Sequence, residues 1–132
     1  MDEAVVKYYR KLLRTRFEYA GSFENPSIFL DTIGEKVSIC SQTSDFIHLY
    51  INVVDNKIYD IQYMCVCDPT TNVAIDILCT LVKGKNLDEA ASETEQAFFQ
   101  FLGSDSEELQ KKARGLLKLL NIGITRYKAQ TL

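Results

Sequence analysis

The chain has 132 residues, of which 46% are hydrophobic and 25% charged, and this length and balance predict one domain over residues 1–132. The formal net charge of −3 argues against nucleic acid or an anionic membrane as a partner. Because neither a targeting segment nor a bilayer-spanning stretch is recognisable, we expect a cytoplasmic protein. In that reducing compartment, cysteines are expected to bind metal or to react rather than to form disulfides.

The first half of the chain predicts a helix followed by strands. Apolar residues recur at helical spacing from Glu3 to Arg16, which predicts an amphipathic helix with a basic outer face. A loop over residues 21–26 follows, and Val37 to Cys40 is predicted to be a short strand. Apolar and polar residues then alternate over Phe46–Val54 and again over Ile58–Cys67, which predicts an antiparallel hairpin.

The second half of the chain predicts helices. Asp68 is a candidate N-cap for a helix that starts at Pro69 and stops near Gly84. Two more helices are predicted over Leu87–Leu102 and from Ser106 to about Leu120, with the lysine-rich stretch 111–118 on a solvated helix face. The order helix, strands, helices indicates an α+β fold, in which helices cover one face of a small antiparallel sheet of about three strands.

Cysteines carry the chemistry that the sequence predicts. Cys65 and Cys67 are two residues apart at a strand-to-helix junction, so both thiols can face one site. Cys67 precedes a helix N-terminus, which favours the thiolate, whereas Cys65 could equally be a small core residue. Cys40 precedes a polar turn, where a metal ligand could sit, and Cys79 is interpreted as a packing residue. His48, the single histidine, is predicted to be solvated, which weakens any Cys–His hydrolase hypothesis.

Four segments together resemble the NifU/IscU-type iron–sulfur cluster assembly scaffolds over nearly the whole chain. The opening helix is followed by Phe23-Glu24-Asn25-Pro26, Cys40-Ser41-Gln42 falls where the family has Cys-Gly-Asp, and the hairpin leads into Cys67 at a helix start. The most specific string is Leu81-Val82-Lys83-Gly84-Lys85-Asn86-Leu87-Asp88-Glu89-Ala90, which is similar to the family's "vkGKsldEa". The resemblance implies the α+β scaffold fold.

The sequence departs from this family at its functional positions. Gln42 stands where the family has an aspartate, and spacing back from Val82 places the family's second cysteine at Asp68, one residue beyond Cys67. The position of the family's third cysteine falls near Lys111–Ala113, and no cysteine or histidine occurs after Cys79.

The resemblance also implies a function, namely a non-enzymatic scaffold for iron–sulfur cluster assembly. Iron, a transient [2Fe–2S] cluster, or zinc in the empty scaffold would be held by Cys40, Cys65 and Cys67, with Asp68 as an oxygen ligand beside Cys40 and Cys67. Which of Cys65 and Cys67 is the ligand stays open. The implied partners are a cysteine desulfurase, acceptor proteins and, in a homodimer, a second copy. The alternative is an interaction module that kept the fold and lost the cluster.

Overall fold

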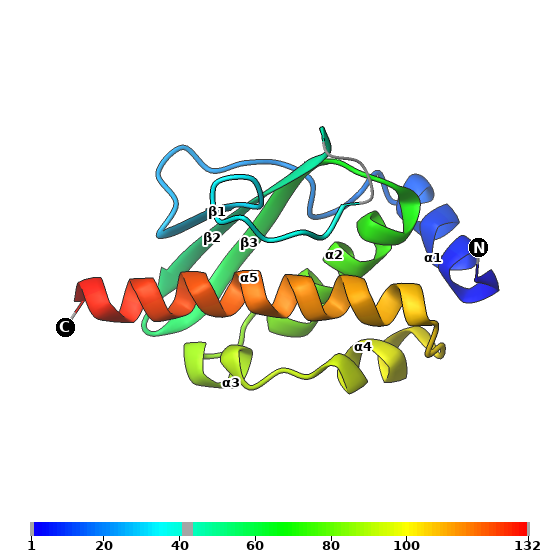
Figure 1. Cartoon of the computed structure of the whole chain (residues 1–132). Helices are drawn as coiled ribbons and strands as arrows, with labels where there is room; N and C mark the ends of the chain where they lie inside the picture. The colour runs from blue at the N-terminus through cyan, green and yellow to red at the C-terminus, as the bar shows by residue number, and fades with distance from the viewer. Residues whose placement is uncertain (1, 41–43, 132) are drawn as a thin grey trace.

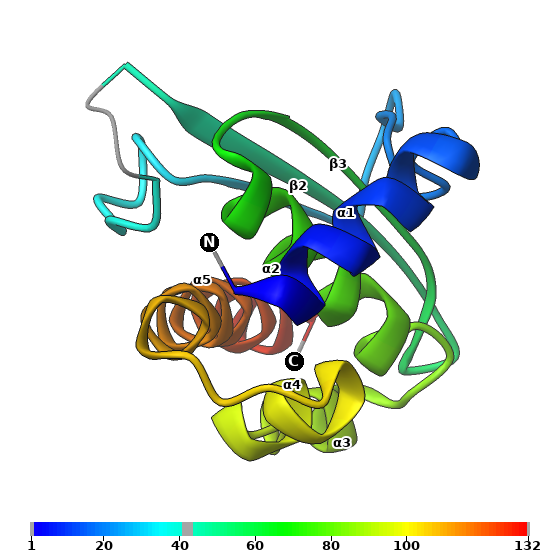
Figure 2. The same cartoon turned by 90° about the vertical axis from the view of Figure 1, so that its right-hand side faces the viewer.

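The computed structural model describes residues 2–40 and 44–131, and these form a three-stranded sheet with helices on one side (Figures 1 and 2). The strands are β1 (Ile28–Asp31), β2 (Phe46–Val54) and β3 (Lys57–Val66). The helices are α1 (Glu3–Arg14), α2 (Pro69–Val82), α3 (Leu87–Ala91), α4 (Glu95–Leu102) and α5 (Glu107–Thr131). The predicted α+β class is therefore confirmed.

The predicted hairpin of β2 and β3 is confirmed, and β2 is the central strand of the sheet. Its turn consists of Asp55 and Asn56, both at positive φ (53° and 62°), the conformation that matches the twist of a two-residue hairpin. β1 pairs antiparallel with the other edge of β2, with Ile28 opposite Ile51. The inward-facing residues Ile47, Leu49, Ile51 and Ile61 are fully buried, as the alternation predicts.

The predicted third strand is wrong, because the third strand is Ile28–Asp31 and not Val37–Cys40. Val37 and Ile39 are buried while Ser38 between them is exposed, so the segment has the alternation of a strand. It belongs to no ladder, however, and the Val37 N–H donates to the carbonyl of Thr32 across a turn. An extended segment that packs against α5 can therefore show the same alternating burial as a strand in a sheet.

Side-chain caps set the helix boundaries, and the sequence pattern predicted some of these boundaries but not all. Asp68 caps α2 as predicted, since its Oδ1 accepts the Thr71 N–H at 2.8 Å. The predicted helix Leu87–Leu102 is divided into α3 and α4, because the Thr94 side chain accepts the Ala97 N–H and starts a new helix. α5 continues to Thr131, well beyond the predicted end. In the described chain no helix is long and apolar enough to cross a bilayer.

Two glycines let α5 pack closely against the chain beside it. A Cβ at Gly123 would lie 2.7 Å from Leu30 Cδ1, and a Cβ at Gly115 would lie 2.7 Å from Ile39 Cγ1. The absent side chains therefore allow β1 and the segment 37–40 to lie directly on α5. This contact fixes Cys40 with respect to the first turns of α5.

A hydrogen bond between half-buried Tyr8 and buried Asp76 joins α1 to α2. The Tyr8 hydroxyl donates to Asp76 Oδ1 at 2.6 Å, and Asp76 is only 4% exposed. Burial raises the pKa of the Asp76 carboxyl, and the hydrogen bond from Tyr8 opposes that rise. Removing the hydroxyl by Tyr8→Phe leaves the buried carboxyl without this donor, a change that typically costs roughly 1–3 kcal/mol of stability.

Asp76→Asn should remove a pH dependence from the free energy of unfolding. Because the pKa of Asp76 is raised in the folded state, folding favours the protonated carboxyl. The stability of the wild type relative to the variant should be highest below the unfolded pKa and should fall as pH rises through the folded pKa. Urea unfolding of both proteins between about pH 4 and about pH 7 measures this difference. A difference that stays constant or grows with pH would contradict the assignment.

Candidate functional site

A buried lysine joins two of the segments that carry predicted site residues. Lys112 lies in α5 and is 6% exposed. Its Nζ donates to the carbonyl of Ile39 at 2.5 Å and forms an ion pair with Asp68 Oδ2 at 3.4 Å. One ammonium therefore connects the residue before Cys40 to the residue after Cys67. The predicted solvated face of the lysine-rich stretch is wrong at this position.

The two carboxylate oxygens of Asp68 have different partners. Oδ1 accepts the backbone N–H of Thr71 at 2.8 Å and the Thr71 hydroxyl at 3.0 Å, which holds the carboxylate at the start of α2. Oδ2 faces Lys112. The cap therefore orients the carboxylate toward α5, and the ion pair links α2 to α5.

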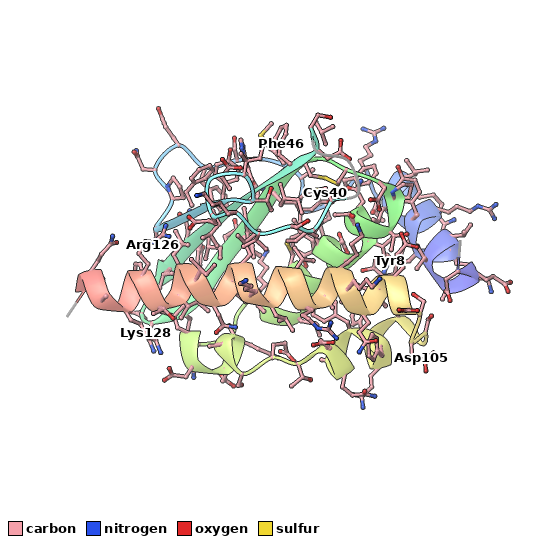
Figure 3. All side chains as sticks on the ribbon, viewed as in Figure 1. Tyr8, Cys40, Phe46, Asp105, Arg126 and Lys128 are labelled. Carbon is pink, nitrogen blue, oxygen red and sulfur yellow. A yellow bond between two sulfur atoms is a disulfide. The ribbon has the colours of Figure 1, made fainter. Side chains whose placement is uncertain are left out.

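Cys40 lies beside this ion pair, half-buried and with a free thiol. Figure 3 places it near Phe46, at the end of the molecule where β2 starts. Burial raises the pKa of the Cys40 thiol, as do the carboxylates of Asp45 and Asp68, whereas the Lys112 ammonium lowers it. Lys112 is thus the group that favours a thiolate at Cys40.

Cys65 and Cys67 are joined in a disulfide, which differs from the expectation that the cysteines stay unpaired. The chain bends where β3 ends, and the two Cα atoms are 5.7 Å apart, within the usual range of about 4.4–6.8 Å for disulfides. Both residues are half-buried. Their sulfur atoms therefore share one site, as the i, i+2 spacing predicts.

An open groove of about 730 Å³ leads to Cys65. Its lining includes Arg16, Phe17, Tyr63, Phe46 and Asn72. Asn72 Oδ1 is 3.4 Å from Cys65 Sγ and also accepts the Tyr63 hydroxyl at 3.5 Å. Arg16 is exposed and supplies a positive charge along this otherwise largely apolar groove.

The remaining predicted positions lie elsewhere. Gln42 falls outside the described residues. Cys79 is fully buried in α2, within the core. His48 is on the outer face of β2, where its Nε2 lies 3.5 Å from Asp31 Oδ1.

Lys112 is the site residue that sequence reasoning missed. Leu109, Lys112, Ala113 and Leu116 are all buried and follow the i, i+3, i+4, i+7 spacing of one helix face. A lysine on an apolar stripe, within the stretch 111–113 near which the resemblance puts the family's third cysteine, was the available signal.

The side chains at this site favour anionic sulfur species over free metal ions. Within residues 2–40 and 44–131, no cluster of three or more histidine, cysteine or acidic side chains could hold a metal ion. The Lys112 ammonium neutralises Asp68 and repels a free divalent cation. The same ammonium attracts thiolates, persulfide anions and thiolate-bound clusters, whose net charge is negative.

The fold was compared with known proteins. Neither a protein-family model nor a curated protein matches the chain. A solved structure from Fervidobacterium islandicum AW-1, described as an iron–sulfur cluster assembly scaffold protein for the SUF system, matches with a TM-score of 0.65 at 17% identity, covering 94% of this chain and 96% of its own. A NifU-like N-terminal protein from Brucella abortus matches with a TM-score of 0.57 at 14% identity, covering 98% of this chain and 92% of its own.

A third solved structure, of a hypothetical protein, has a TM-score of 0.60 at 14% identity and covers 91% of this chain and 98% of its own. These matches extend over nearly the whole length of both partners in each pair. The chain therefore has the fold of the SufU- and NifU-like scaffold proteins, and the predicted resemblance is confirmed for the fold.

Lys112→Met should raise the pKa of the Cys40 thiol, because the substitution removes the cation that favours the thiolate while keeping an unbranched apolar stem. With Cys65–Cys67 oxidised and Cys79 buried, Cys40 is the accessible free thiol in the described chain. Its alkylation rate by iodoacetamide as a function of pH measures this pKa.

The matched control is Lys111→Met, which removes an exposed charge one residue earlier. It should leave the pH profile of alkylation nearly unchanged, since an exposed charge is screened by solvent. Equal profiles for Lys112→Met and the wild type would show that Lys112 does not influence Cys40.

Proposed function

We propose that this protein acts in iron–sulfur cluster assembly, as a scaffold that receives sulfur before iron. Cys40, Cys65 and Cys67 are the proposed sulfur ligands of a transient [2Fe–2S] cluster, and Asp68 is a proposed oxygen ligand of its iron. A cysteine desulfurase would supply the sulfur, and acceptor proteins would receive the cluster. In this role the protein holds the cluster and passes it on, and it does not catalyse cluster transfer as an enzyme.

The observation that carries the proposal is the ion pair of Lys112 with Asp68, which draws together the chain next to Cys40 and the chain next to Cys67. The resemblance puts family ligands at Cys40 and, within one residue, at Cys67, and the fold supports this comparison. The three cysteines are all half-buried, so a cluster held by them would be accessible for transfer.

The charge of Lys112 supports an order of events. A free ferrous ion meets an ammonium already paired with the only proposed oxygen ligand, Asp68. Once thiolates and sulfide are present, the growing cluster is anionic, and the same ammonium then stabilises it. For Asp68 to bind iron through Oδ2, its ion pair with Lys112 must break. Because the loss of the ion pair opposes iron binding, the cluster is held weakly and is readily transferred.

The second candidate is an interaction module that kept the fold and lost the cluster. The same residues favour it, because the resemblance puts the family's third cysteine near Lys112 and, by spacing, its second at Asp68, and neither residue supplies a thiolate. An Asp68–Lys112 pair then serves as a structural link between α2 and α5 in place of a metal.

Anaerobic reconstitution separates the two candidates. The reduced protein is incubated with ferrous iron, L-cysteine and a cysteine desulfurase, and its absorption and bound iron are measured. We expect a coloured protein with stoichiometric iron and sulfide. Cys40→Ser and Cys67→Ser should each abolish the colour, because a hydroxyl does not replace a thiolate as a soft ligand.

Cys79→Ala is the control, since this cysteine is fully buried away from the site, and it should retain the colour. If the folded wild type stays colourless and binds neither iron nor zinc, the interaction module is the better description. Colour that persists in Cys40→Ser would exclude Cys40 as a ligand.

A further inference from the structure

From the geometry of the Cys65–Cys67 pair we infer a further activity, which rests on the proposed function: this pair reduces a persulfide and releases inorganic sulfide. Sulfur transferred between cysteines travels as sulfane sulfur, whereas a cluster contains sulfide. Two electrons per sulfur atom must therefore be supplied. Two neighbouring thiols that become one disulfide supply two electrons.

The first observation is that the two sulfur atoms can bond to each other without a change of fold. The bend after β3 brings the Cα atoms of Cys65 and Cys67 within disulfide range, and the structure contains the bond. A persulfide formed on one of these cysteines is therefore within reach of the other thiolate.

The second observation is the groove, which gives the two cysteines different roles. Cys65 lines the groove of about 730 Å³, and Cys67 does not. The groove is large enough for a small persulfide or for the tip of a protein loop that carries one. Arg16 on its lining attracts the anionic persulfide, and Asn72 presents a polar carboxamide oxygen beside Cys65 Sγ. Cys65 is therefore the acceptor.

The third observation is the place of Cys67, immediately before Asp68 and the start of α2. Cys67 lies outside the lining of the groove, and its sulfur is bonded to Cys65 Sγ, so it is placed to attack a persulfide carried by Cys65. Cys67 is therefore the resolving nucleophile.

The reaction balances with these two residues and a persulfide donor. The Cys65 thiolate attacks the terminal sulfur of the donor, the S–S bond of the donor breaks, and the donor leaves as a thiolate, so that Cys65 carries the persulfide. The Cys67 thiolate then attacks Cys65 Sγ, the persulfide S–S bond breaks, and the terminal sulfur leaves as sulfide and takes up a proton to form hydrosulfide.

The product is the Cys65–Cys67 disulfide that the structure contains. Both thiolates are oxidised and the sulfane sulfur is reduced by two electrons. A dithiol reductant of the thioredoxin type then restores the two thiols by thiol–disulfide exchange. Until that reduction occurs, neither residue is available as a cluster ligand, so sulfide release and cluster binding alternate at the same pair.

The test uses the reduced full-length protein, free of small thiols and of iron, with glutathione persulfide as the probe. We expect a burst of about one sulfide per chain, the number set by one dithiol. Mass spectrometry should show the Cys65–Cys67 disulfide in the same sample. Added dithiol should convert the burst into continued sulfide release. If the persulfide donor is a protein, a cysteine desulfurase with L-cysteine should give the same result as glutathione persulfide.

Two variants separate the roles of the cysteines. Cys67→Ser should keep one additional sulfur atom on Cys65 and release sulfide only at background rate. Cys65→Ser should neither carry that sulfur nor release sulfide above background. Cys79→Ala, with its cysteine buried in the core, should behave as the wild type. Circular dichroism of each variant establishes that it is folded.

Sulfide release by Cys67→Ser at the wild-type rate would overturn the inference, as would a wild type that releases no more sulfide than Cys65→Ser. Because the assay contains no iron, its result is independent of cluster formation. A protein that forms a cluster but releases no sulfide would refute this inference alone, and one that releases sulfide but forms no cluster would refute the proposed function alone.

Discussion

The buried ion pair between Lys112 and Asp68 is the interaction on which the arrangement of the site depends. Lys112 reaches from α5 to the carbonyl of Ile39 and to the carboxylate that caps α2. Gly115, one turn further along α5, lets Ile39 approach closely enough for this contact. A buried ammonium with these partners satisfies the charge of Asp68, and its removal would leave a partly desolvated carboxylate at the helix start.

This ion pair also determines which chemistry the site favours. In a scaffold with three thiolates, iron meets only negative or neutral ligands. Here the Lys112 ammonium lies between the residue before Cys40 and the residue after Cys67. Sulfur in its anionic forms is attracted to such a site more readily than iron. The disulfide-forming pair at the end of β3 fits this picture, because it handles sulfur and electrons without needing a metal.

Much of the fold could be predicted from the sequence, because local patterns were strong where they coincided with tertiary contacts. Strict alternation over Phe46–Val54 and the Asp68-Pro69 start of α2 each predicted the correct element. The strand expected at Val37–Cys40 failed because packing on α5 produces the same alternation. The segment Ile28–Asp31 is short and follows a loop, so its pairing with β2 is a long-range contact that a local pattern does not reveal.

Of the candidate site, the cysteines and Asp68 were proposed from the sequence and remain a prediction, whereas Lys112 could be found only by combining two signals. These are its place on the apolar stripe of α5, which depends on knowing where α5 packs, and the resemblance, which puts the family's third ligand near residues 111–113. The disulfide of Cys65 and Cys67 depends on the bend after β3, which spacing alone does not define.

The central claim is that Lys112 keeps bare iron out of the candidate site formed by Cys40, Cys67 and Asp68. Anaerobic titration of ferrous iron into the reduced wild type and into Lys112→Cys tests it most directly, because the variant replaces the ammonium by a third thiol. The account predicts that Lys112→Cys binds iron stoichiometrically and that the wild type, without sulfide or persulfide, binds it far more weakly. Iron binding by the wild type as tight as that of Lys112→Cys would contradict it.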